Sequence, residues 1–114
     1  MFTATANQIL QPVDVAVTTA EMSVAEFVVQ FTAVLTVQIE NLDSTQVFAG
    51  RVQRRLDPAM GWASSPTLDF AVIGPGETVV ADLDVRGSSG VRIVGAASGA
   101  GLNVRVTARS RASS

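Results

Sequence analysis

Residues 27–39, which read FVVQFTAVLTVQI, decide the fold. Every odd position from Phe27 to Ile39 is apolar, whereas the even positions are mostly polar. Alternation with a period of two indicates a β-strand that buries one of its faces. At about 3.3 Å per residue this stretch would span roughly 43 Å, which is long for a small domain. We therefore expect a bend or bulge near residues 32–34, or a strand that switches sheets there.

The same alternation recurs along the rest of the chain, and turn-forming residues separate the runs. In the run at 68–73, Leu68, Phe70 and Val72 share one face, opposite Ile73. No stretch has a helical period, and residues 19–25 are expected to form one short turn at most. About seven or eight short strands joined by regular turns predict an all-β fold, an antiparallel β-sandwich of jelly-roll or immunoglobulin-like type. The other strand runs are 13–17, 47–56, 79–86, 91–94 and 102–109, and the turns are 41–44, 58–61, 64–66, 74–77, 87–90 and 98–101.

The composition excludes most catalytic chemistry. A chain of 114 residues with 47% hydrophobic and 16% charged residues has room for one packed domain. It contains no histidine, cysteine, lysine or tyrosine, so the usual zinc ligands, thiol nucleophiles, disulfides and imidazole bases are missing. We expect a protein that is not an enzyme, with no catalytic residues, no metal site and no cofactor.

Charge is distributed unevenly along the chain. Residues 1–50 hold five acids and no arginine, whereas residues 51–114 hold eight arginines and five acids. Either the two halves pair as neighbouring strands of one fold, or an acidic face of one subunit meets a basic face of the next. A net charge of −2 argues against a general nucleic-acid binder.

The first 20 residues differ from the rest, since Asp14 is their only charged side chain. They predict either an ordinary first strand or an arm that lies on a neighbouring subunit through Phe2, Ile9 and Leu10, with the sandwich domain over residues 21–114. No positive segment precedes an apolar one, so no secretory signal is expected. Polar residues interrupt the apolar stretch 24–42, so no membrane helix and no membrane partner is expected.

Carboxylates are the remaining acid–base groups. Asp82 and Asp84 lie two apart on one face of a strand, which is the beginning of a calcium site, but the other ligands of a calcium loop are missing and a solvated sheet face is favoured. Asp57 and Asp69 have no feature that supports a glycosidase pair. The glycine-rich segments join strands, so they indicate hairpin turns and not phosphate cradles.

Two further features point to a binding surface. Arg105 and Arg109 share a face of the last strand, with Arg92 expected across from them, which indicates either a grip for a polyanion or pairing with acids of a neighbouring strand or subunit. Trp62, the only tryptophan, follows a glycine in a loop. It is expected to cap the open end of the sandwich, to anchor an interface or to stack on a sugar.

The stretch from residue 46 to 109 resembles a β-sandwich module of bacteriophage structural proteins. The matching elements are Asp57, Trp62, Pro75-Gly76, Val91-Arg92-Ile93-Val94, Ser98-Gly99-Ala100-Gly101 and Val104-Arg105-Val106. The resemblance implies a virion component: a head decoration (cement) protein, the base of a head fibre or a tail accessory. Small all-β decoration proteins usually sit as trimers at three-fold positions of the capsid.

The resemblance and the composition together lead to one expected function. We expect a capsid decoration protein, made in the host cytoplasm and located on the capsid surface, which forms a homo-oligomer, expected as a trimer, and binds the major capsid protein. The interface residues expected are Phe2, Ile9, Leu10, Trp62, Arg105 and Arg109. The alternatives are a tail, head-fibre or carbohydrate-binding sandwich that uses Trp62, and a bacterial protein-interaction domain unrelated to a virus.

Overall fold

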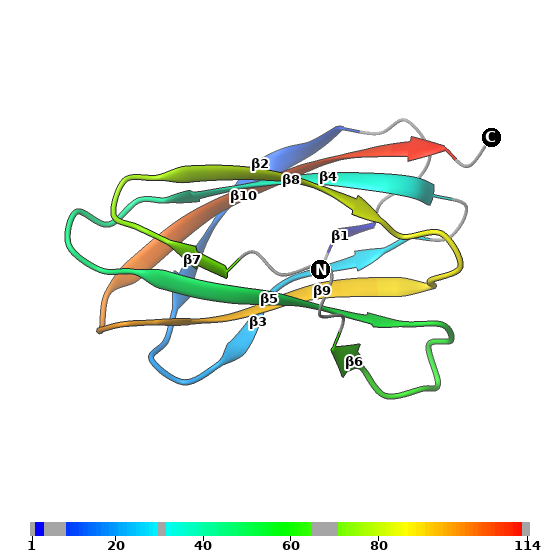
Figure 1. Cartoon of the computed structure of the whole chain (residues 1–114), viewed down its shortest axis with the longest axis horizontal. Helices are drawn as coiled ribbons and strands as arrows, with labels where there is room; N and C mark the ends of the chain where they lie inside the picture. The colour runs from blue at the N-terminus through cyan, green and yellow to red at the C-terminus, as the bar shows by residue number, and fades with distance from the viewer. Residues whose placement is uncertain (1, 4–8, 30–31, 65–70, 113–114) are drawn as a thin grey trace.

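The computed structural model describes residues 2–3, 9–29, 32–64 and 71–112, and this part of the chain is built from strands. Two sheets lie face to face with the core between them, so the predicted all-β sandwich is confirmed (Figure 1). No helix in these residues is long and apolar enough to cross a membrane.

One sheet, here called sheet A, has the strand order β1-β3-β9-β5, with β6 and β7 both paired to the outer side of β5. Only β1 and β3 run parallel; every other pairing in this sheet is antiparallel. Its far edge is thus made of two short strands instead of one. The bounds are β1 Phe2–Thr3, β3 Met22–Val28, β5 Phe48–Arg55, β6 Ala63–Ser64, β7 Ala71–Ile73 and β9 Gly90–Ala97.

The second sheet, sheet B, is fully antiparallel and has the order β2-β10-β4-β8. From β2 to β5 the chain changes sheet at every step, and it changes again from β7 to β8, β9 and β10 (Figure 1). This interleaved order fits the jelly-roll form of the expected sandwich. The bounds are β2 Ile9–Val17, β4 Thr32–Asn41, β8 Thr78–Asp84 and β10 Leu102–Ala112.

The long alternating stretch at 27–39 is divided between the two sheets. β3 ends at Val28 in sheet A and β4 begins at Thr32 in sheet B, so of the two expected alternatives the switch of sheets is observed, a few residues earlier than expected. The alternation hides the switch because the same odd positions face the core on both sides of it: Phe27, Val29, Leu35 and Ile39 are all buried. The short turn expected at 19–25 is wrong for most of its length, since β3 begins at Met22.

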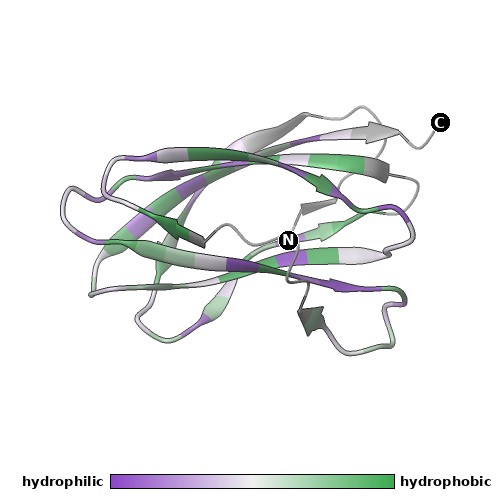
Figure 2. Cartoon of the chain, viewed as in Figure 1, coloured by the Kyte–Doolittle hydropathy of each residue, from purple (hydrophilic) through white to green (hydrophobic). Residues whose placement is uncertain are grey.

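Most of the remaining runs also face the core as their alternation predicts. Val91 and Ile93 in β9, and Leu102, Val104, Val106 and Ala108 in β10, are buried, and apolar and polar residues alternate along β10 (Figure 2). The face expected for the 68–73 run is wrong where it is described. Ile73 is fully buried, whereas Val72 is 63% exposed, because the short β7 pairs with β5 in the register that turns Ile73 inward beside Phe48.

A pair of glycines makes room for the largest side chain at one end of the core. Gly50 of β5 lies opposite Gly95 of β9, and the ring of the fully buried Phe48 lies over both. A Cβ atom on Gly50 would stand 2.7 Å from Cε1 of Phe48, and one on Gly95 would overlap ring atoms Cε2 and Cζ. The ring of Phe48 thus fills the space over Gly50 and Gly95, which the side chains of two larger residues would otherwise occupy.

Replacing Gly95 by alanine is expected to lower the free energy of unfolding by about 1–3 kcal/mol, because the added methyl group overpacks the Phe48 ring. Urea denaturation followed by circular dichroism measures the change. The matched control is Gly61→Ala, because no atom lies within 4 Å of a Cβ built there. A second change, Phe48→Leu, should restore part of the loss in Gly95→Ala. Equal stability of Gly95→Ala and the parent chain would contradict the packing described.

Candidate functional site

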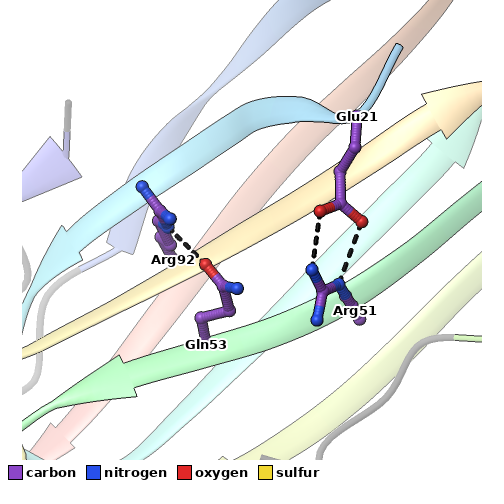
Figure 3. Close-up of polar contacts among 4 residues, drawn as sticks. All are labelled: Glu21, Arg51, Gln53 and Arg92. Atoms are coloured by element: carbon purple, nitrogen blue, oxygen red, sulfur yellow. Dashed lines mark hydrogen bonds and ion pairs between the residues drawn. The ribbon is translucent and has the colours of Figure 1, made fainter. Parts of the chain in front are cut away.

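The outer face of sheet A carries a row of polar contacts that runs across three strands. At the start of β3, Glu21 receives two hydrogen bonds from Arg51 of β5, from Nε to Oε2 at 2.9 Å and from Nη2 to Oε1 at 2.7 Å (Figure 3). Next to this ion pair, Nε of Arg92 in β9 donates to Oε1 of Gln53 in β5 at 2.6 Å (Figure 3). The residues meet because Gln53 and Arg92 are direct partners in the β5–β9 register.

Trp62 lies at the end of this row, on the loop that leads from β5 to β6. The guanidinium carbon of Arg55 is 4.3 Å from the centroid of its ring, and that of Arg92 is 4.8 Å away. Both contacts are in the range of cation–π attraction. The ring approaches the sheet over Gly90, where a Cβ would stand 3.1 Å from Cη2 of Trp62. The structure therefore places Trp62 against the outer face of sheet A, half-buried.

A pocket of about 330 Å³ opens beside this cluster of Arg55, Trp62 and Arg92. Its apolar part is formed by Leu56 and Met60, which are 65% and 62% exposed. Two consecutive arginines of β5 also contribute to its lining. The lining residues are Arg54, Arg55, Leu56, Met60, Gly61 and Ala63. The arrangement places cationic and apolar groups next to each other at the surface.

The arginine stripe expected from the sequence is divided between the two sheets. Arg105 and Arg109 lie on β10, exposed on the outer face of sheet B. Arg92 belongs to β9 in sheet A, so the expectation that it lies across from them is wrong. The physical reason is the change of sheet between β9 and β10, which turns the outward residues of the two strands to opposite sides of the sandwich.

Acids of the first half of the chain pair with arginines of the second half within one molecule. Nε of Arg105 donates to Oδ1 of Asp14 at 2.8 Å, across the β2–β10 pair, and Arg51 binds Glu21. The Arg105 guanidinium holds the pKa of Asp14 below its usual range, and Arg51 does the same for Glu21. Of the two interpretations of the uneven charge, these contacts favour pairing of strands inside one fold.

Where they are described, the carboxylates that were considered for catalysis or metal binding have hydrogen-bond or ion-pair partners within the fold. Asp82 and Asp84 share the outer face of β8, but Asp82 accepts a hydrogen bond from Oγ1 of Thr36 at 2.6 Å and Asp84 pairs with Arg86 at 2.9 Å. Asp57 accepts from the backbone N–H of Ala59 in a turn. Asp69 lies outside the described residues. No group of three or more acidic side chains is placed to hold a metal ion in the part that the structure describes.

The expected interface residues near the start of the chain lie in strands. Phe2 belongs to β1 and pairs with Phe27 along the edge of sheet A. Ile9 and Leu10 begin β2, opposite Arg109 and Ala108 of β10. The structure thus places all three in the backbone pairing of the sandwich edges, and their side chains lie outside the described part.

Sequence reasoning selected Trp62, Arg105 and Arg109 but missed the partners of Trp62. Arg55 and Gln53 lie two residues apart on β5. The sequence predicts Arg92 across from Arg105 and Arg109 instead of beside Trp62. The period of two gave a usable signal, because it places Gln53 and Arg55 on one face. The missing information was the β5–β9 register, in which the paired residues are between 35 and 49 positions apart in the chain.

Comparison with known proteins identifies the fold and no family. No family model and no curated protein matches the chain. Among solved structures, a crystal structure of PirA is similar with a TM-score of 0.55 at 19% identity, covering 88% of this chain and 93% of that one. A chain from Bacillus endospore appendages, described as disulfide-linked pili, has a TM-score of 0.50 at 13% identity and covers 96% and 93%. These two likenesses show the fold alone.

A third structure, the SPBc2 prophage-derived protein YomS, matches more loosely. Its TM-score is 0.49 at 16% identity, and the match covers 93% of this chain and 98% of that one.

Acid should destabilise the fold in a defined pH range. Arg86 lowers the pKa of Asp84 to about 2, while in the unfolded chain this carboxyl has its ordinary pKa of about 3.9. The unfolded state therefore binds the proton first, so this stabilisation is complete above about pH 4 and is lost as pH falls through about 2. Thermal unfolding at pH 2 to 7 measures the loss. Asp84→Asn and Arg86→Gln should each make the acid decline shallower, and an unchanged profile in both would contradict the assignment.

Proposed function

We propose that this chain is a non-enzymatic structural protein of a bacteriophage particle. It decorates the head as a homo-oligomer, expected as a trimer, that binds the major capsid protein, and it uses no cofactor. The residues proposed for these contacts are Phe2, Ile9, Leu10, Trp62, Arg105 and Arg109. The phage assignment is supported by the module that residues 46–109 resemble, whose Asp57-to-Trp62 loop and glycine turns are quoted above.

The observation that supports a role in assembly is the set of sandwich edges to which no further strand of the described residues is paired. β2 and β8 are the outer strands of sheet B, and β7 lies at an edge of sheet A. Large apolar side chains are exposed on them: Val13 is 41%, Val80 59% and Val72 63% exposed. An edge strand that bears exposed apolar residues is a ready partner for another chain. Coverage by other subunits removes both the unpaired backbone groups and the apolar surface from water.

The fold is also suited to assembly. The similar chain from Bacillus endospore appendages belongs to a pilus, so a sandwich of this kind serves as a subunit of an ordered assembly in that case. The present chain has no cysteine, so any comparable contacts here would be non-covalent.

The proposal predicts self-association and binding to phage heads. Sedimentation velocity at rising protein concentration should show an oligomer, and co-sedimentation with emptied heads of the encoding phage should saturate. The control is bovine serum albumin, which should stay in the supernatant. A chain that remains monomeric at millimolar concentration and does not bind heads would overturn the proposal.

Deleting residues 2–11 tests the role of the first strands. The deletion removes β1 and the beginning of β2 but leaves the β2 residues that pair with β10 from Leu102 to Val106. We expect a folded sandwich that self-associates more weakly, measured by circular dichroism and sedimentation. Loss of the folded state on deletion would instead make residues 2–11 an integral part of the core.

Changing Arg105 and Arg109 to glutamine should also weaken association, and the effect should be larger at low salt than at high salt.

A further inference from the structure

We propose that Arg55, Trp62 and Arg92, together with the pocket beside them, bind an acidic peptide segment of a partner protein that carries an apolar side chain next to its carboxylates. The site is formed by the outer face of sheet A and the loop between β5 and β6. The inference uses only this surface, so it holds whether or not the chain is a virion component.

The first argument is that two guanidinium groups lie against one indole ring and neither is held in an ion pair, although Glu26 stands opposite Arg92 in the strand register. Arg55 and Arg92 both lie against the ring of Trp62, at 4.3 and 4.8 Å. Within the described residues neither forms an ion pair, whereas Arg51, Arg86 and Arg105 each bind an acid. Arg92 instead donates to the neutral Gln53, and Nε of Arg55 is buried with no hydrogen-bond partner. Neighbouring like charges of this kind favour the binding of an anion.

The second argument is the shape and chemistry of the adjacent pocket. Its volume of about 330 Å³ is enough for a side chain or two, and its wall includes the exposed Leu56 and Met60. Methionine adapts its shape to different apolar partners. Arg55 both lines this pocket and contacts the Trp62 ring, so an apolar side chain bound there would place a neighbouring carboxylate near the Arg55 guanidinium group.

The third argument is that the positive region is small and bounded. Glu21 neutralises Arg51 on one side of the row, and Glu26 of β3 stands opposite Arg92 in the strand register. Outside this spot the chain has a net negative charge. A nucleic acid needs a basic track that follows several phosphates. One or two carboxylates of a short peptide fit a local site of two or three arginines better.

Contact with two arginines also sets this site apart from a sugar platform. A tryptophan that stacks on sugars presents an exposed ring, while the Trp62 ring is half-buried and has two guanidinium groups within 4.8 Å of its centroid. In this geometry the indole orients the arginines, because cation–π contact restrains both guanidinium groups beside the sheet.

The binding test uses the intrinsic fluorescence of the full chain. Trp62 is the only tryptophan and there is no tyrosine, so emission excited at 295 nm reports on this site alone. The probe is a synthetic peptide with blocked ends, Gly-Ser-Asp-Leu-Asp-Ser-Gly, and its control has asparagine in place of aspartate. We expect a saturable change with the acidic peptide, and binding about tenfold weaker for the control, since charge-assisted hydrogen bonds are lost.

Variants separate the charged part of the site from its apolar part. Arg55→Gln and Arg92→Gln should each weaken binding of the acidic peptide about tenfold, whereas Arg86→Gln, which breaks the ion pair with Asp84 after β8, should leave it unchanged. Met60→Ser should weaken binding of the leucine peptide, with Val80→Ser on sheet B as its control. Urea denaturation of each variant shows that it remains folded.

Several results would overturn the proposal. These are no saturable signal up to millimolar peptide, equal binding of the aspartate and asparagine peptides, and equal binding by the Arg55→Gln, Arg92→Gln and Arg86→Gln variants. Tighter binding of a 12-nucleotide oligothymidylate, or of sialyllactose, than of the acidic peptide would assign the site to a nucleic acid or a glycan instead. None of these outcomes bears on association through the strand edges, so the two proposals fail independently.

Discussion

The structure depends on filling the space between two sheets from both sides with side chains that alternate along each strand. Phe27, Leu35, Ile39 and Ile93 are buried on these inner faces, and Phe48 fits only because Gly50 and Gly95 leave room for its ring. With the inner faces committed to the core, polar residues of the same strands are forced outward. The row on sheet A is therefore a consequence of core packing, since the register that buries Val52 also aligns Gln53 with Arg92.

The alternation of apolar and polar residues predicted the all-β fold class, because it is a local pattern that can be recognised separately in most of the strands. It could not show that residues 27–39 change sheet, since Phe27 and Leu35 face the core whether the strand continues or crosses over. It also misjudged Val72 and Ile73, where both neighbours are apolar and alternation carries no information. There the pairing of a three-residue strand with β5 decides which side chain is buried.

The candidate site shows the same division between local and long-range information. A lone tryptophan in a chain without tyrosine is easily selected from sequence. Its contacts with Arg55 and Arg92 require β5 and β9 to be neighbours, and no local pattern encodes that pairing. Gly90 illustrates the difference: in the sequence it closes a turn, and in the structure it leaves the space over which the indole ring lies.

The positions of β9 and β10 have a consequence for biosynthesis. Each is an interior strand of its sheet, β9 between β3 and β5 and β10 between β2 and β4, yet both belong to the last quarter of the sequence. A ribosome that has made residues 1–85 has released strands that lack their central hydrogen-bonding partners. Such non-local topology folds slowly. Neither sheet can therefore complete its pairing until residues 90–112 are available, because β9 and β10 supply the central partners of both.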